Sequence, residues 1–197
     1  MRLVVAIGNP GVRYFGTRHN VGFAVVDAVA RRVGRHFRKA SPHHMEAELE
    51  GGLLVKPVTY VNRTGTALEP LLERFDLEDL LVVVDDVNLD LGRLRVRAKG
   101  SHGGHNGLRD VERVVGSAAY GRLRIGVAPS GDEPFDLDEH VLGPFGDNET
   151  DTIGRAVERA ADCVQDFLGG ATLERLMPLH NGYDPEARAR EDEGAET

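Results

Sequence analysis

Residues 8–20, GNPGVRYFGTRHN, combine turn-forming glycine and proline with the imidazole of His19 and the amides of Asn9 and Asn20. An imidazole with an unperturbed pKa of about 6.5 is largely neutral inside a cell, so it can accept a proton from water. A histidine fixed next to a helix is therefore a candidate general base. An ordinary surface turn would carry the same residue types, and this segment alone does not separate the two interpretations.

Two carboxylates, Asp85 and Asp86, directly follow residues 80–84, the most apolar run of the chain. Paired carboxylates at the end of a strand indicate either a functional site or a helix cap. No helical pattern follows them, because residues 93–98 alternate between cationic and apolar side chains, as a strand does. If the strand continues through both acids, their side chains point to opposite faces, and Asp86 could serve only to cap the turn.

A third polar segment, GSHGGHNGL at residues 100–108, surrounds His102, His105 and Asn106 with four glycines and leads into a helical pattern. Backbone N–H groups at such a helix start suit an anion or a carbonyl oxygen, although many glycine-rich turns only reverse the chain. The two histidines lie in a flexible loop without an evident third ligand. This argues against a metal site.

A sheet would bring these polar segments together. Residues 3–7 form an apolar run typical of a buried strand, and apolar residues then recur at helical spacing over 23–33, with Asn20 as N-cap and Gly34 as stop. The alternation of such patterns along the chain predicts an α/β fold, a single domain with a central mixed twisted sheet packed by helices on both faces. Open sheets of this class bind ligands at the carboxyl ends of their strands, where the polar segments stand. The other predicted elements are a hairpin arm at 37–39 and 46–50, strands at 53–56, 80–84, 93–98 and 122–127, and helices at 68–75, from 108, and at 153–169.

Length and composition agree with one soluble domain. The chain has 197 residues, of which 41% are hydrophobic and 28% charged, and we assign residues 1–183 to the domain. Residues 184–197 contain no large apolar side chain and hold six acidic residues against two arginines. Such a composition cannot form a core, so we expect an acidic, disordered tail.

Cysteine usage and hydropathy predict the compartment. Cys163 is the only cysteine, which excludes a disulfide within the chain and favours the reducing cytoplasm. No apolar run approaches the roughly 18 residues that would span a bilayer, and we expect neither a signal peptide nor a membrane anchor. No group of cysteine and histidine has zinc-binding spacing either.

The distribution of charge qualifies the net charge of −8, which at first argues against a nucleic-acid partner. The tail carries −4 of this total, whereas residues 93–124 hold eight cationic side chains against two acidic ones, a local charge of +6. A local positive field of this kind attracts a polyanion.

Five segments within residues 7–127, GNPGVRYFGTRHNVGF, KPVTYVNRTG, VVVDDVNLDLG, GSHGGHNGL and RLRIGV, occur in the order found in the bacterial peptidyl-tRNA hydrolases, and a weaker VLGPF at Val141 extends the similarity. The chain resembles this family over most of its predicted domain. The resemblance implies hydrolysis of the ester that joins a peptide to the terminal ribose of tRNA, without a metal or other cofactor. It also implies a cytoplasmic monomer that binds the acceptor stem and 3′ end of its substrate, with no membrane and no obligate protein partner.

The same resemblance assigns roles to individual residues. His19 is implied to be the general base that activates water, and Asp85 its partner, which holds the tautomer and stabilises the imidazolium. Three amides are implied to bind the peptide backbone, the ester carbonyl or the terminal adenosine, and which amide does which is left open: Asn9, Asn62 and Asn106.

Four further residues take part through the same resemblance. His105 corresponds to a substrate-contacting histidine, while Tyr14 either stacks on the substrate or packs beside the cleft. Arg97 and Arg124 fall where the family binds the 5′ phosphate of tRNA, and arginine favours bidentate phosphate contacts. A solvated strand face would also explain the alternation of these cations, though not their concentration on adjacent segments.

Four positions depart from the family pattern. Val61 stands where methionine is common, Asn88 where aspartate is common and Asp90 where proline is common, while Glu133 lies near a position that is often basic. The first could reshape the peptide pocket, and the last could weaken contact with the tRNA stem. None of them removes His19, Asp85 or a site amide.

Two other function classes remain open on the sequence alone. A noncatalytic RNA-binding relative would keep the basic strand but would not need both His19 and Asp85, so their presence argues against it. A metal-dependent phosphoesterase or nuclease would need carboxylates from several loops, whereas only Asp85 and Asp86 qualify.

Overall fold

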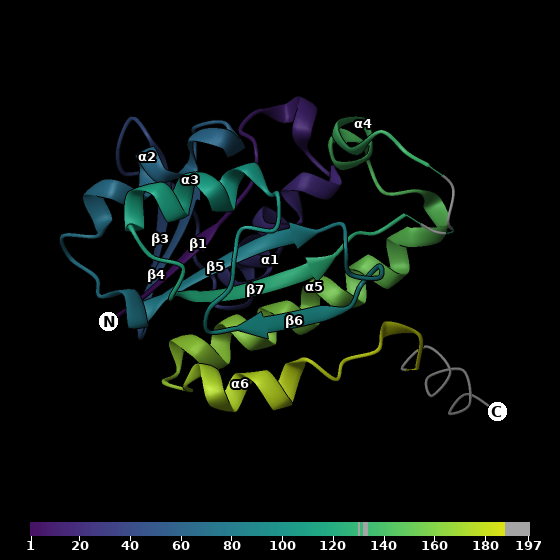
Figure 1. Ribbon diagram of the computed structural model, residues 1–197. Coiled ribbons are helices and arrows are strands. Elements are labelled where there is room, and N and C mark those ends of the chain that lie inside the picture. Colours follow the sequence, from purple (N-terminus) through teal and green to yellow (C-terminus); the bar gives the residue numbers. More distant parts are fainter. Residues whose placement is uncertain (130, 132–133, 188–197) are drawn as a thin grey trace.

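The computed structural model describes residues 1–129, 131 and 134–187. Seven strands form one sheet in the order β2-β3-β4-β1-β5-β7-β6 (Figure 1). The four central strands are parallel, and both edges are antiparallel, which confirms the predicted mixed sheet. The strands are β1 Arg2–Ala6, β2 Arg38–Lys39, β3 His44–Leu49, β4 Gly52–Pro57, β5 Leu80–Asp86, β6 Leu94–Arg97 and β7 Gly121–Gly126.

Helices cover both faces of the sheet, as predicted (Figure 1). One face carries α1 Val21–Arg32, the long α5 Asp147–Leu168 and α6 Leu173–His180, while α2 Thr64–Leu68 and α3 Asn106–Val115 pack on the other. The short α4 Leu137–Leu142 lies beyond the carboxyl ends of the strands.

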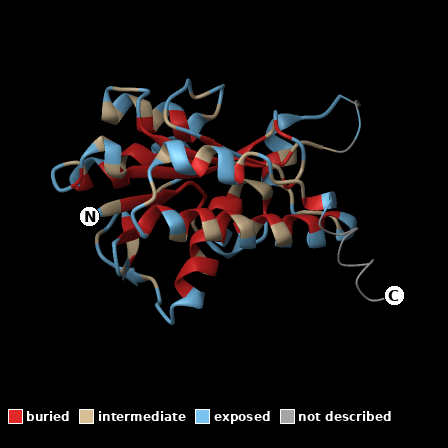
Figure 2. Ribbon diagram, turned by 90° about the horizontal axis from the view of Figure 1, so that it is seen from below, coloured by how far each residue is buried: buried red, intermediate tan, exposed pale blue. Residues whose placement is uncertain are grey.

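The central strands are apolar throughout because both of their faces are covered. Within β1, Leu3 and Val5 pack into the cluster under α3, whereas Val4 and Ala6 pack into the cluster over α1 and α5. Figure 2 shows the buried strands between helices whose outer surfaces are exposed. The strand ends, and with them the polar segments, are thereby held on a rigid support.

The helices of the structure differ from the prediction in the predicted segment 68–75 and in two helices that were not predicted. The helix predicted over 68–75 begins earlier, at Thr64, and gives way to a 3-10 turn at Glu69–Leu71. Pro70 explains the change, because proline disfavours a helical residue before it and supplies no N–H. The helices α4 and α6 were not predicted from the sequence; α4 has only 6 residues and α6 contains Pro178.

The first residues of the predicted tail contact the domain. Asp184 pairs with Arg93 at 3.1 Å, and Glu186 accepts a hydrogen bond of 3.0 Å from the hydroxyl of Thr152. Residues 188–197, the rest of that tail, lie outside the described part of the chain. Among the described residues, no helix combines the length and the apolar character that a membrane crossing requires.

Candidate active site

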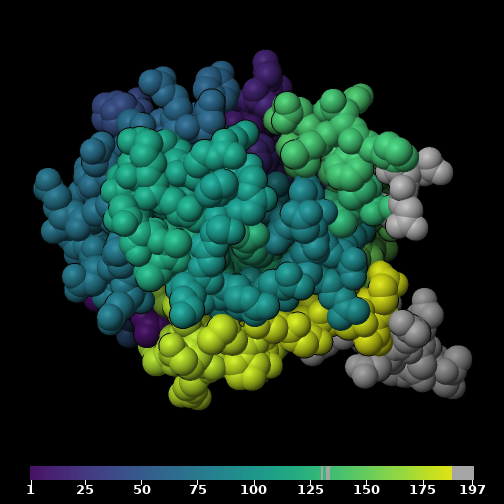
Figure 3. All heavy atoms as spheres, in the orientation of Figure 1, coloured from purple at the N-terminus to yellow at the C-terminus, as the bar shows by residue number. Residues whose placement is uncertain are grey.

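A cleft of about 260 Å³ opens where the carboxyl ends of β5 and β7 meet the glycine-rich loop before α3. His19 and Asp85 line it together with residues 102–106, Arg124 and part of α4. In Figure 3 the recess lies between the teal segment that contains α3 and the green segment that contains α4. Segments that are more than a hundred residues apart in the sequence therefore share one cleft.

His19 and Asp85 are in direct contact at the centre of this cleft. Nδ1 of His19 lies 2.9 Å from one carboxylate oxygen of Asp85 and 3.0 Å from the other. The histidine belongs to a 3-10 turn, Arg18–Asn20, that leads into α1, while the acid is the penultimate residue of β5. Because Nδ1 faces the carboxylate, Nε2 is the atom left for a water molecule or a substrate.

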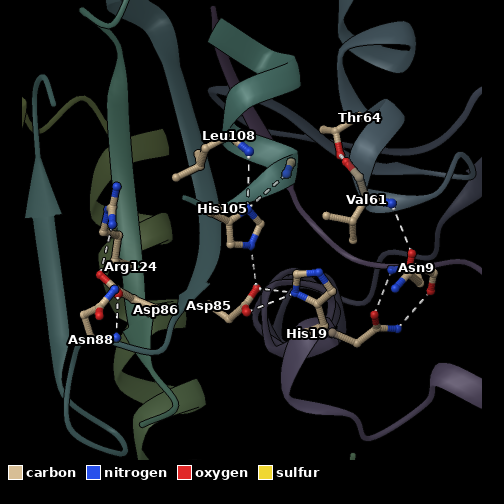
Figure 4. A network of polar contacts seen from close by, with 12 residues as sticks. Asn9, His19, Val61, Thr64, Asp85, Asp86, Asn88, His105, Leu108 and Arg124 are labelled. Atoms are coloured by element: carbon tan, nitrogen blue, oxygen red, sulfur yellow. Dashed lines mark hydrogen bonds and ion pairs between the residues drawn. The ribbon is translucent and has the colours of Figure 1, made fainter. Parts of the chain in front are cut away.

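His105 binds the same carboxylate from the start of α3, with its ring centroid 5.1 Å from that of His19 (Figure 4). Its Nε2 lies 3.1 Å from Asp85 Oδ1, and its Nδ1 accepts the backbone N–H groups of Gly107 and Leu108 as the N-cap of α3. An Nδ1 that accepts these bonds carries no proton, so Nε2 carries it and donates to Asp85. Both ring nitrogens of His105 are thus engaged within the protein, although the sequence predicted a substrate contact for this residue.

The contacts shift the pKa values of the central pair. Burial alone would raise the pKa of Asp85, but the interactions with His19 and His105 outweigh burial and hold this pKa well below its ordinary range. Burial lowers the pKa of His19, yet the charge and hydrogen bond of Asp85, with a smaller contribution from Asp138, raise it above 6.5 overall. The carboxylate is therefore ionised at neutral pH, and the imidazole is a stronger base than a free histidine.

The ligand atoms of His19, Asp85 and His105 all lie within 4.8 Å of one another, which makes them the group among the described residues that could hold a metal ion. The hydrogen bonding argues against this use. Nε2 of His105 faces the carboxylate with its proton rather than with a lone pair, because Nδ1 is occupied by the cap of α3. The three residues are better described as a hydrogen-bonded chain.

Asn9 is held by contacts on both its backbone and its side chain. Its N–H donates to Asn20 Oδ1 at 2.8 Å, its carbonyl accepts from Asn20 Nδ2 at 3.0 Å, and its own Oδ1 accepts from the N–H of Val61 at 3.1 Å. Asn20 was expected to cap α1, but its side chain makes no capping bond and binds Asn9 instead. The Nδ2 group of Asn9 is left as the donor that can face a substrate.

Of the predicted site residues Asn106, Asn62 and Tyr14, only the first lines the cleft. Asn106 lines the cleft as the first residue of α3 and accepts a bond from Arg109. Asn62 is exposed in the turn after β4, outside the residues that line the cleft. Tyr14 is buried against Tyr60, with ring centroids 6.4 Å apart, and Arg13 covers its ring. Packing is the role that these contacts favour for Tyr14.

The two predicted phosphate-binding arginines share one face of the sheet at diagonal positions. Arg97 pairs with Arg122 in the register of β6 and β7, and Arg124 lies two residues farther along. Arg97 is exposed. Arg124 is mostly covered and bound to Asp86 at 3.0 Å and to the carbonyl of Ser101 at 2.9 Å (Figure 4). A phosphate at Arg124 would therefore compete with an internal carboxylate.

The positive charge of residues 93–124 is partly neutralised in the fold. Arg122 is fully buried, pairs with Glu112 at 3.1 Å and stacks on Tyr120. The other cations of this segment that pair with acids are Arg93, Arg113 and Arg124. Arg95, Arg97 and Lys99 form an exposed cationic strip along β6 and the loop after it, without an ion pair among the residues that the structure describes.

One wall of the cleft was missed by the sequence analysis. Leu137, Asp138 and Val141, all on α4, line the cleft opposite the glycine-rich loop. A signal for this helix was present, since Asp136 caps it by accepting the N–H of Glu139 at 2.8 Å, and an aspartate three residues before a glutamate is typical of a helix start.

Three of the four departures from the family pattern fall within the described residues, and Asn88 is the one of these three that lines the cleft. Val61 is buried and packs close to Gly107, at the start of α3. Asn88 donates its N–H to Asp86 in a tight turn, and Asp90 accepts the N–H of Arg93. Glu133 lies outside the described residues.

Comparisons with known proteins identify the family to which this sequence and fold are similar. A family model described as peptidyl-tRNA hydrolase matches residues 3–188. A relative of that name from Halalkalibacterium halodurans is 42% identical over 88% of this chain and 97% of its own length, and one from Chlorobaculum parvum is 42% identical over 92% and 98%. A crystal structure of peptidyl-tRNA hydrolase from Acinetobacter baumannii superposes with a TM-score of 0.84 at 33% identity, over 94% of this chain and 96% of that one.

Proposed function

The chain belongs to the peptidyl-tRNA hydrolase family and hydrolyses the ester bond between peptide and tRNA. From this premise we propose that His19 is the general base, and that Asp85 orients its imidazole and raises its pKa. The observation that carries the proposal is the contact between His19 Nδ1 and Asp85, at 2.9 Å, which leaves Nε2 directed to the cleft.

The first step is the attack of water on the ester carbonyl. Nε2 of His19 takes one proton from the water, and the hydroxide oxygen forms a bond to the carbonyl carbon. The ionised Asp85 stabilises the imidazolium that results, without itself taking the proton, because its pKa is held far below neutrality.

The second step expels the tRNA. The tetrahedral intermediate carries a negative oxygen, and side-chain amides are suitable donors to it. Asn106 lines the cleft with His19, whereas Asn9, whose Nδ2 group is left available because its Oδ1 is fixed by Val61, borders a neighbouring pocket. When the carbon–oxygen bond to the ribose breaks, the imidazolium returns its proton to the leaving ribose oxygen.

His105 has a positioning role, because it contacts Asp85 and not the reacting atoms. Its Nε2–H bond to the carboxylate and its cap of α3 fix Asp85 in the orientation that His19 requires. For the tRNA, the exposed strip of Arg95, Arg97 and Lys99 is the contact surface for the acceptor stem. Within this strip we assign the 5′ phosphate to Arg97, with Arg124 as a second contact once Asp86 is displaced.

We further propose that the enzyme works as a cytoplasmic monomer without a metal. A base, its orienting carboxylate and amide donors are the groups that hydrolysis of an activated ester needs. A single chain supplies all of them in one cleft.

Release of peptide from peptidyl-tRNA in the presence of a chelator tests the reaction as a whole. The tRNA is kept folded by a polyamine in place of magnesium, and peptide release is followed under single-turnover conditions. An unchanged rate is the expected result. Loss of the rate that returns on addition of a divalent ion would favour metal-dependent hydrolysis, whereas binding of tRNA without release would favour a noncatalytic RNA-binding protein.

A further inference from the structure

Arg18, the residue before His19, is buried against the wall of the cleft that α4 forms. Its side chain is 12% exposed and pairs at 2.6 Å with Glu149, whose side chain is 9% exposed. The same guanidinium donates to the carbonyl of Pro144 at 2.6 Å and to that of His140 at 3.4 Å. Its backbone N–H donates to the carbonyl of Gly143 at 3.1 Å.

These contacts supply hydrogen-bond donors to the carbonyls at the end of α4. The last carbonyls of a helix have no partner within the helix, and a helix of 6 residues is too short to be stable alone. The guanidinium and the backbone N–H of Arg18 together donate to three carbonyls in or just after the last turn of α4, at 140, 143 and 144. Arg18 therefore caps α4 from another part of the chain.

The segment between α4 and α5 is also held at its other end, where α5 begins. Glu149 also accepts the N–H of Gly146 at 2.7 Å, which closes the start of α5. Thr17 forms an isolated bridge with Pro144, and the ring of Phe145 lies 5.2 Å from the guanidinium. The turn that carries His19 is thus joined to the end of α4 by hydrogen bonds of Arg18 and the bridge of Thr17, and to the start of α5 by the part-buried ion pair of Arg18 and Glu149.

We propose that Arg18 and Glu149 are positioning residues that fix α4 at the distance from His19 at which the cleft binds its substrate. Leu137, Asp138 and Val141 of α4 face the cleft that His19 lines, so the position of this helix decides how closely the wall contacts the substrate. The inference rests on the proposed function only in taking this cleft as the substrate site.

The variants separate positioning from folding. Removal of one partner leaves a buried charge unpaired, whereas replacement of both partners by apolar side chains of similar size is often neutral for stability. Arg18→Met combined with Glu149→Leu should therefore fold and keep the backbone bond to Gly143, but lose the guanidinium bonds to His140 and Pro144 that cap α4. Arg18→Lys keeps a positive charge for Glu149 and loses the planar fork that reaches several carbonyls.

Arg32→Met is the matched control. Arg32 also ties two helices together through several bonds, to Glu158 and Asp162 of α5, but it lies away from α4. The control should lose stability without a change in the cleft.

Two measurements are made on each protein: amide hydrogen exchange of residues 137–142 compared with 173–180 in α6, and KM and kcat for peptidyl-tRNA. In the double variant we expect exchange in α4 to accelerate about tenfold or more, with α6 unchanged. We expect KM to rise roughly 5- to 50-fold, with a smaller change in kcat. Arg18→Lys should show the same changes to a smaller extent.

A folded double variant with normal exchange in α4 and normal KM would overturn the proposal. Equal acceleration of exchange in α4 and α6, or a rise in KM for Arg32→Met as large as that of the double variant, would also overturn it. Exchange is read without turnover and without substrate. This part of the test therefore remains decisive even if His19 is not the base.

Discussion

Asp85 and Asp86 are neighbours at the end of β5, and their carboxylates lie on opposite faces of the sheet, one bound to His19 at 2.9 Å and the other to Arg124 at 3.0 Å. The strand continues through both acids, and its alternation separates them. One carboxylate thereby serves the proposed base, while its neighbour holds a cation that the sequence assigned to tRNA.

His19→Ala should lose most of its turnover, by a factor on the order of 10² or more, because the variant lacks the imidazole that Asp85 orients toward the cleft. The measurement is single-turnover cleavage of peptidyl-tRNA at saturating enzyme. Affinity for the uncleaved substrate, measured in the same variant, should stay near that of the parent protein. Cleavage by His19→Ala at a near-normal rate would remove this residue from the mechanism.

The dependence of kcat/KM on pH should show an acidic limb above pH 6.5, because the pKa of His19 is raised and the base must be neutral to act. Activity therefore falls as the pH drops through this raised pKa and levels off above it. Asp85→Asn removes the main cause of the increase, so its limb should move to lower pH while its plateau falls. A limb that stays in place in Asp85→Asn would contradict the assignment.

The pH dependence of kcat/KM should also be measured for Asp138→Asn. Asp138 contributes a smaller increase to the pKa of His19, so its variant should shift the acidic limb slightly to lower pH. Because Asp85, and not Asp138, holds the hydrogen bond to His19, the plateau should change far less than in Asp85→Asn.

The fold could be predicted from the sequence where one physical rule dominated. Residues 3–7 and 80–84 are continuous apolar runs, and both are central strands because only a doubly covered sheet buries such runs. The same rule placed His19 and Asp85 near the carboxyl ends of such strands, whereas their roles were implied by the family resemblance. Pro70 was the local signal that was overlooked in the helix predicted over 68–75, and α5 begins at Asp147, ahead of its predicted start at 153.

Contacts that depend on register could not be predicted. Arg122 and Arg97 have the same alternating pattern, yet Arg122 is fully buried under α3 and Arg97 is exposed on the edge strand. Alternation reports two faces and does not tell whether a helix covers one of them. The partnership of Asn9 with Asn20 was hidden in the same way, because the position of Asn20 before a helix predicted a cap.

Truncation after Ala187 should leave the melting temperature and hydrolysis unchanged. Truncation after Tyr183 also removes the contacts of Asp184 and Glu186 with Arg93 and Thr152. These are partly exposed contacts, and exposed pairs contribute at most about 1 kcal/mol, so the melting temperature should fall by only about 2–4 °C. Thermal melting of the two truncated proteins is the measurement. An equal fall in both would mean that residues 188–197 are needed for stability.

Asp86→Asn should strengthen tRNA binding if Arg124 contacts a phosphate, because the variant frees this guanidinium from its carboxylate. One more phosphate contact steepens the dependence of log affinity on log salt by about 0.9. The control is Asp110→Asn, which frees Arg113 on α3 with the same change in net charge. Equal gains in the two variants would leave only a general effect of charge and no specific contact at Arg124.

Arg97 is the better single test of the phosphate contact, because it is exposed and has no acid partner among the described residues. Arg97→Ala should raise KM for peptidyl-tRNA and flatten the salt dependence of binding by a little under one unit. A short ester substrate that ends at the terminal adenosine lacks the 5′ phosphate, so its hydrolysis should hardly change. Binding and chemistry then separate, as they must if the arginine neutralises the substrate far from the ester.

Arg175→Ala on α6 is the control for this last prediction. It removes the same charge from an exposed helix on the other side of the sheet, so it reports the effect of net charge alone. If Arg175→Ala weakens tRNA binding as much as Arg97→Ala, the specific contact is wrong and only a diffuse field acts on the tRNA. If the short ester loses as much activity as peptidyl-tRNA in Arg97→Ala, the arginine acts on the cleft rather than on the phosphate.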